Sequence, residues 1–463
     1  NERLQHPLAQ TPAALVDRSI LTHRGLRVAL GGVLLLWVWN LSAGWGWHPL
    51  PRISTDFTLP GIDGIFGANA PGRWVTGGYW ASIKLYPAAI GIAFLLTLDL
   101  GFSVWGGFWF GVLGFGLLAL AGGQASFESD GRFLGAGATL GMAGLILFAG
   151  RHHYARLLLA AFGRATMDED RPGVWGLRAA LAASIAIALL VWHLGGGTFP
   201  AAAGGILAVV LVGAFALVIA RVIVECGLAN FQSAHEMTLL ANSLGLPVLL
   251  PYGVFTTLIF LGQTLMYDTR ENLSGYLVQG VAAGERGGLN PGRLHLLLGG
   301  VAIAAAGIAL VSSFLAPWHL DGGKIGTGML QSQSVTGLVA QATAAPDGPL
   351  AFWVDALFAS PVLLGAGLVL AIALLRRVWV GCPINPIGLV IAVSWPVFVI
   401  WGSLMLGWLA KVLCLRYGGL GLYRRLKPAA IGLILGDVLG YCLQFLVTTL
   451  VRLGGTDLGI WRN

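Results

Sequence analysis

The chain has 463 residues, of which 56% are hydrophobic and only 10% are charged, with a mean hydropathy of +0.79 and a net charge of +7. A soluble domain carries about a quarter of its residues as charged side chains, so this composition excludes a soluble globular protein and predicts a surface that faces lipid. The positive charge is concentrated in a few loops, where it sets membrane orientation, and it does not indicate a nucleic-acid partner.

Long apolar runs follow one another along the whole sequence. Runs of about 20 residues are long enough to cross a hydrocarbon core about 30 Å thick. Because backbone groups in lipid must be satisfied within the element, and because these runs do not alternate, they predict helices. We therefore expect an all-α, polytopic membrane protein, a single transmembrane domain with about 11 spans. The predicted spans are 26–47, 82–98, 103–122, 132–149, 177–194, 201–220, 246–265, 294–316, 354–374, 387–410 and 429–451.

Basic residues mark the loops on the cytoplasmic side of a membrane. Arg24 and Arg27 stand at the start of the first span, which predicts a cytoplasmic N-terminus. The basic loop 150–176 is expected on the same side. The loop around Glu128 carries balanced charges and is expected on the opposite side.

One predicted span separates two basic segments, Arg376–Arg377 and the cluster 411–427. A straight span would place one of them outside, whereas a re-entrant hairpin would place both inside. Pro383, Pro386 and Pro396 supply the breaks that a hairpin needs. Both arrangements stay open from the sequence.

Segments 221–242 and 327–343 are too polar for ordinary spans and too apolar for solvated loops. Polar or irregular backbone occurs at membrane depth only where protein or a water-filled cavity surrounds it. Transporters build their substrate sites from broken helices of this kind. We therefore predict that both segments are broken or re-entrant.

The first of these segments carries the densest set of candidate residues for a substrate or proton pathway. Arg221 and Glu225 are four residues apart, so they lie on one helix face and can pair. Glu225 either binds a proton or neutralises Arg221. The polar residues that follow line a pocket or belong to a cytoplasmic loop; they are Asn230, Gln232, His235 and Glu236.

Asp437 lies inside the last predicted span, and no basic residue stands within one turn on the same face. An ionisable residue inside a membrane is a functional candidate, and its partner must come from another helix, a bound ion or a proton. Capping of a broken helix is the structural alternative. Asp268, Arg270 and Glu271 close the seventh span and are candidates for gating or for interfacial charges.

The sequence contains no Gly-rich phosphate loop, zinc-site spacing or Ser/His/Asp set. We therefore expect no enzyme activity, no metal and no cofactor. The four cysteines lie far apart and are interpreted as small packing residues.

Four motifs resemble, in order and spacing, motifs of the oligopeptide transporter superfamily, and most closely a bacterial, largely uncharacterised branch. They are ERLQHPLAQTP from Glu2, LDLGFSVW from Leu98, RVIVECGL from Arg221 and RYGGLGLYRRLKPAAIGLILGD, which ends at Asp437. The resemblance implies many helices, some of them broken, around a central cavity, with proton-coupled uptake of peptides or metal chelates. Its motifs also point to Glu2, Glu225 and Asp437 as site residues.

Members of that superfamily look longer, with several helices before the motif that opens this chain. A second membrane polypeptide or a larger complex is expected to supply them, unless they are processed away or lost. We expect a proton-coupled secondary transporter of a small polar solute in a bacterial inner membrane, with lipid around it. The alternative is a non-transporting structural subunit of a larger membrane complex.

Overall fold

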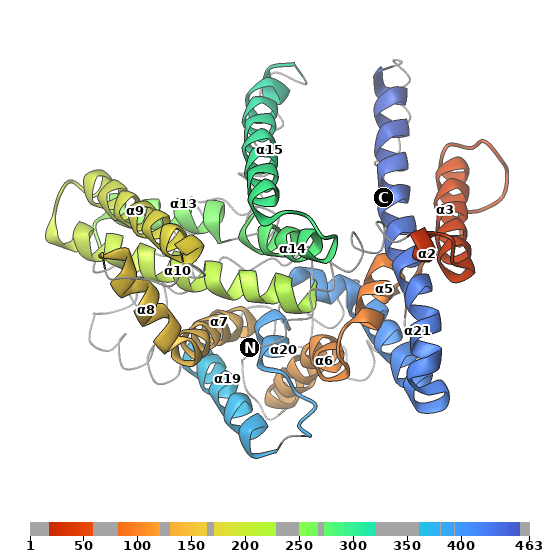
Figure 1. Ribbon diagram of the computed structural model, residues 1–463, viewed down its shortest axis with the longest axis horizontal. Helices are drawn as coiled ribbons and strands as arrows, with labels where there is room; N and C mark the ends of the chain where they lie inside the picture. The colour runs from red at the N-terminus through yellow and green to blue at the C-terminus, as the bar shows by residue number, and fades with distance from the viewer. Residues whose placement is uncertain are drawn as a thin grey trace.

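The computed structural model describes residues 18–58, 82–120, 130–163, 171–227, 250–266, 273–319, 361–379, 381–392 and 394–453 (Figure 1). Within these ranges the protein is almost entirely helical. A short antiparallel pair of strands, β1 (Asp56–Thr58) and β2 (Ser82–Lys84), places Phe57 opposite Ile83.

The helices follow most of the predicted spans, and α8 and α14 are additions between them. Their bounds are α2 (Arg18–Leu21), α3 (Arg24–Gly44), α5 (Pro87–Leu95), α6 (Leu98–Leu120), α7 (Asp130–Ala149), α8 (Arg151–Ala161), α9 (Arg171–Leu194), α10 (Phe199–Cys226), α13 (Tyr252–Leu265), α14 (Leu273–Arg286), α15 (Pro291–His319), α19 (Pro361–Val378), α20 (Pro386–Ile391) and α21 (Trp395–Leu453).

Six helical segments of the described residues are long and apolar enough to cross a membrane. The bent pair formed by α7 and α8, with an angle of 74° between its helices, makes seven if it counts as one span. These segments support the expectation of an all-α membrane protein, whereas the total of 11 spans stays a prediction. The six are Arg24–Gly44, Leu98–Phe115, Gly173–Leu194, Phe199–Cys226, Pro361–Val378 and Pro396–Thr449.

Helix α21 consists of two helices that meet at Gly419, whose φ of 61° and ψ of −162° are not helical. We name residues 395–418 the first arm and residues 420–453 the second arm. A straight helix of 59 residues would be about 90 Å long, three times the thickness of a hydrocarbon core. The break at Gly419 therefore divides α21 into two lengths that each suit a membrane.

Contacts with α5 show how the two arms run. From the start of α5 to its end, its contacts with the first arm pass from Ser403 to Lys411. Its contacts with the second arm pass in the reverse direction, from Asp437 to Tyr423. The two arms are therefore antiparallel, and α5 lies along both of them.

Glycines allow this close approach. A Cβ atom at Gly91 would lie 2.5 Å from the carbonyl oxygen of Ala430, and one at Gly407 would overlap the carbonyl oxygen of Ile90. Small residues let membrane helices pack backbone against backbone, and here they place α5 directly against both arms.

Helix α20 and the first arm form a hairpin along α6. Helix α20 runs beside α6 from Ser103 towards Gly107, a position at which a Cβ atom would lie 2.9 Å from the carbonyl oxygen of Gly388. The chain direction is reversed between the end of α20 at Ile391 and the start of α21 at Trp395. The first arm then returns along α6, from Trp401, whose ring centroid lies 6.0 Å from that of Phe108, to Trp408, which donates to the carbonyl of Leu98.

Two predicted spans differ from the helices found. Residues 387–410 fall in two helices, α20, which ends at Ile391, and α21, which begins at Trp395, because Pro386 and Pro396 each stand in the first turn of a helix, where proline starts a helix but does not extend one backwards. The predicted span 82–98 contains only the short helix Pro87–Leu95 before α6 begins at Leu98, because residues 82–84 pair as β2 and Leu96 adopts an extended backbone with ψ of 161°.

The basic segments share one end of the packed helices. Helices α7 and α19 are parallel, since Gly137 packs on Val362 and Gly141 packs on Ala366. Arg151, which follows α7, and Arg376, in the last turn of α19, therefore lie at the same end.

The hairpin brings Arg376 and Lys411 to the same end of α6, because they contact Asp99 and Leu96 respectively. Helix α3 starts beside the second arm, where Gly432 packs on Leu26. The basic start of α3 thus joins this end, in agreement with the positive-inside rule. The side of the membrane that this end faces stays a prediction.

Replacing Gly91 with alanine should destabilise the protein, because the added Cβ would meet a backbone carbonyl that cannot move aside. We expect a loss of about 1–3 kcal/mol, seen as a lower apparent melting temperature in detergent. Gly32→Ala is the control, since a Cβ there meets no atom within 4 Å. Equal melting temperatures for the two variants would contradict the proposed packing of α5 on the second arm.

Candidate functional site

Asp437 is buried between three helices, with 2% of its surface exposed. Its Oδ1 accepts a hydrogen bond of 2.9 Å from the indole N–H of Trp37 on α3. Its Oδ2 accepts one of 3.0 Å from the backbone N–H of Ala88, in the first turn of α5. The sequence left open a partner from another helix, a bound ion or a proton; the described partners are an indole on α3 and the first turn of α5. No described basic side chain pairs with this carboxylate.

The first turn of a helix leaves backbone N–H groups without a partner in the helix. In α5 the flanking Tyr86 provides no side-chain cap, and Pro87 has no N–H to satisfy. Asp437 supplies the missing acceptor from the second arm. A carboxylate at this end is also stabilised by the positive end of the helix dipole.

Lys411 lies at the opposite end of α5. Its side chain is 8% exposed, its ammonium donates to the carbonyl of Leu96, and Nζ lies 4.8 Å from the ring centroid of Tyr423. A cation is favoured at the C-terminal end of a helix. The two arms of α21 therefore place a negative charge at the positive end of α5 and a positive charge at its negative end.

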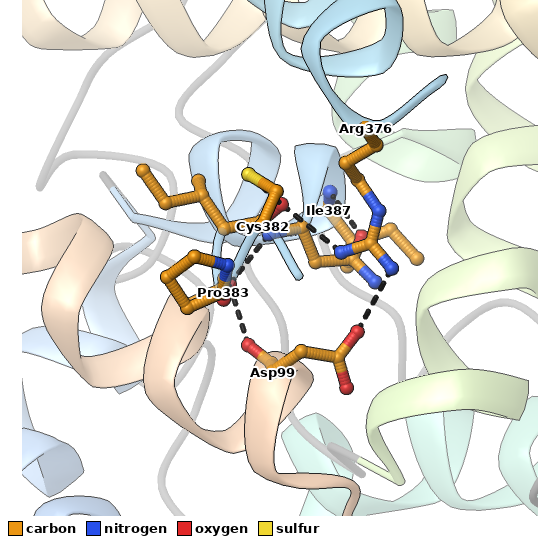
Figure 2. A network of polar contacts seen from close by, with 8 residues as sticks. Asp99, Arg376, Cys382, Pro383 and Ile387 are labelled. Carbon is orange, nitrogen blue, oxygen red and sulfur yellow. Dashed lines mark hydrogen bonds and ion pairs between the residues drawn. The ribbon is translucent and has the colours of Figure 1, made fainter. Parts of the chain in front are cut away.

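A further helix, α19, contacts the chain just after the break between α5 and α6. Asp99, in the first turn of α6, forms an ion pair of 2.9 Å with Arg376 of α19 (Figure 2). Arg376 also donates to the carbonyl of Ile384, at 3.0 Å, in the segment that enters α20. Each member of the pair is about one-third exposed, so the pair orients these segments more than it stabilises the fold.

Ser103 joins α6 to the same segment. Its hydroxyl lies 2.6 Å from the carbonyl of Asp99 and 3.2 Å from that of Pro383, and it accepts a hydrogen bond of 2.6 Å from the backbone N–H of Asn385. The Asn385 side chain in turn caps α20 by accepting from the N–H of Ile387 at 3.1 Å. Ser103 is 3% exposed, so water cannot replace its partners, and these polar groups satisfy one another's hydrogen bonds.

Arg221 and Glu225 form the ion pair that their spacing predicted, on one face of α10. Beyond them, the buried Gln279 of α14 donates to the carbonyls of Ile223 at 2.9 Å and Val224 at 3.3 Å. These are among the last carbonyls of α10; that of Ile223 also accepts from the backbone N–H of Gly227 at 3.0 Å, which closes the end of the helix. This pair belongs to α10 and α14, whereas Asp437 lies among α3, α5 and α21.

The other predicted site residues lie outside the residues that the structure describes. They are Glu2, Asn230, Gln232, His235, Glu236, Asp268, Arg270 and Glu271, and segment 327–343 lies outside as well. Among the described residues, no group of three or more His, Cys, Asp or Glu side chains could hold a metal ion.

Sequence reasoning missed the roles of Lys411, Ser103 and Trp37. Lys411 was counted with the basic loop 411–427, but it lies inside the helix packing. Its position eight residues before the glycine that breaks α21 was the signal that could have separated it from that loop. Ser103 and Trp37 act through contacts more than 200 residues away in sequence, which local patterns do not reveal.

Comparison with protein families matches residues 1–458 to a family of unknown function, DUF6785. The chain belongs to this family. Comparison with curated proteins and with solved structures finds no match. The DUF6785 match covers the whole of the site described above and assigns it no activity.

Ser103→Ala should destabilise the protein by about 1–3 kcal/mol, because it leaves the half-buried N–H of Asn385 without the acceptor that it now has. Thr449→Val is the control, since the Thr449 hydroxyl donates to the carbonyl of Phe445 in its own helix, which contributes little. Apparent melting temperatures in detergent measure both. A Ser103 variant as stable as the Thr449 variant would show that the hydroxyl does not hold the hairpin.

Proposed function

We propose that this DUF6785 protein is a proton-coupled secondary transporter of a small polar solute, with Asp437 as the proton-binding carboxylate. The observation that carries the proposal is the burial of Asp437 without a described cationic partner. A buried carboxylate that has hydrogen-bond donors but no counter-ion can take up a proton without leaving an opposite charge unpaired in lipid.

Glu225 is less suited to this role. It is paired with Arg221 four residues earlier on the same helix. A proton on Glu225 would break this ion pair, which is costly for partly buried charges. We therefore assign Glu225 a structural role and Asp437 the coupling role.

The helix breaks support transport as the function. Helix α5 ends at the break before α6. Helix α20 ends beside the middle of α6, and the chain then returns in the opposite direction as the first arm. Secondary transporters place discontinuous helices of this kind around the substrate near the bilayer midplane. The resemblance to oligopeptide transporters implies peptides or metal chelates as the substrate class.

A proton on Asp437 would also change the contacts of α5. The protonated group carries one hydroxyl donor, so it accepts less well from the two N–H groups that it now bonds. The start of α5 would lose part of its cap from the second arm. Proton binding to Asp437 would thereby be linked to the position of α5, the short helix that ends at the break before α6.

Asp437→Asn should abolish accumulation of labelled dialanine by proteoliposomes under an inward proton gradient, because asparagine cannot bind and release the proton. Exchange of internal for external dialanine should persist, since exchange needs no proton release. Accumulation equal to that of the unmodified protein would remove Asp437 from the mechanism. If the unmodified protein neither accumulates dialanine nor moves protons, the scaffold-subunit alternative is favoured.

Glu225→Gln is the matched control, because it removes a carboxyl proton site from a paired position. Its apparent melting temperature should fall, because the pair with Arg221 is lost. The protein that stays folded should retain accumulation within about threefold of the unmodified protein, a change of less than about 1 kcal/mol. Loss of accumulation in this variant, with accumulation retained in Asp437→Asn, would reverse the two assigned roles.

A further inference from the structure

Exposed arginines from two helices converge where α3 meets the second arm. Arg24 and Arg27 lie in the first turn of α3, and Arg424 and Arg425 lie on the second arm. A Cβ atom at Gly25 would lie 3.6 Å from the Cβ of Ala429. Because Ala429 is one turn after Arg425 on the same helix face, the arginines of both helices lie at this junction.

The junction carries no described acidic side chain to balance these charges. Residues 400–436 contain five basic residues and no acidic residue, and the structure describes no ion pair for the four arginines. Like charges brought together repel one another unless an anion lies between them. The junction is therefore built to receive a negatively charged group.

An apolar surface continues from these arginines along α3. The exposed fractions of Val28, Leu35 and Val38 are 74%, 72% and 48%. Their spacing of seven and three residues places them on one face with Arg24 and Arg27. Gly31 and Gly32, between them, have open space where a side chain would be.

A cationic head above an open apolar face matches the profile of one lipid molecule, with phosphate at one end and an acyl chain below it. We propose that the junction of α3 and the second arm is a binding site for an anionic phospholipid. Its headgroup lies among Arg24, Arg27, Arg424 and Arg425, and its chain lies along α3. This site is independent of the proposed transport.

Native mass spectrometry of the delipidated protein tests the site, with phosphatidylglycerol and phosphatidylcholine of identical chains as probes. We expect tighter binding of phosphatidylglycerol, and binding about thirtyfold weaker in Arg24→Gln/Arg425→Gln, since each basic side chain near a lipid surface contributes about fivefold. Arg151→Gln/Arg156→Gln removes the same charge from α8 at the same end of the protein and should leave binding unchanged.

Equal binding of the two lipids would overturn the proposal. So would unchanged binding in Arg24→Gln/Arg425→Gln, or equal weakening in the α8 variant. The charge-retaining Arg24→Lys/Arg425→Lys should bind phosphatidylglycerol nearly as the unmodified protein does, which separates loss of charge from misfolding. Displacement of the bound lipid by glycerol 3-phosphate, which has no acyl chain, would show that the site takes a free phosphate and would contradict the lipid assignment.

Discussion

The nine-residue helix α5 is held at its two ends by opposite charges that come from the two arms of α21. Asp437 satisfies the N–H of Ala88 at the positive end of the helix dipole, and Lys411 satisfies the carbonyl of Leu96 at the negative end. A helix this short is marginal on its own, so its position depends on these contacts and on the glycines that let the arms approach. This arrangement explains why Asp437 and Lys411 lie inside otherwise apolar segments of α21.

The same arrangement determines how the surrounding segments run. With α5 between them, the arms reverse at Gly419, and the first arm returns along α6 after the end of α20. This return brings Lys411 to the end of α6 at which Arg376 lies. Asp99 lies there between α19 and the break that separates α5 from α6. Basic segments distant in sequence thereby reach one end of the protein, where an anionic lipid surface would meet them.

Composition and hydropathy predicted the helical membrane class, and the positions of most long helices, because lipid imposes the same requirement on every span. The spacing of Arg221 and Glu225 predicted their pair, since both lie on one helix. The donors to Asp437 could not be predicted, because Trp37 and Ala88 are about 400 and 350 residues away and meet it only through packing. The break between α20 and α21 was indicated by the prolines, but the sequence could not decide between a straight span and a hairpin.

Disulfide cross-linking tests most directly whether α5 lies between the two arms. In a background without the four native cysteines, we would introduce one pair at Tyr86 and Ser403 and another at Phe94 and Tyr423, which are in contact in the structure and avoid the close-packed glycines. The account predicts that each pair, introduced in a separate variant, cross-links in membranes under mild oxidation. Cross-linking of one pair alone would place α5 against a single arm and would contradict the arrangement on which the proposed role of Asp437 depends.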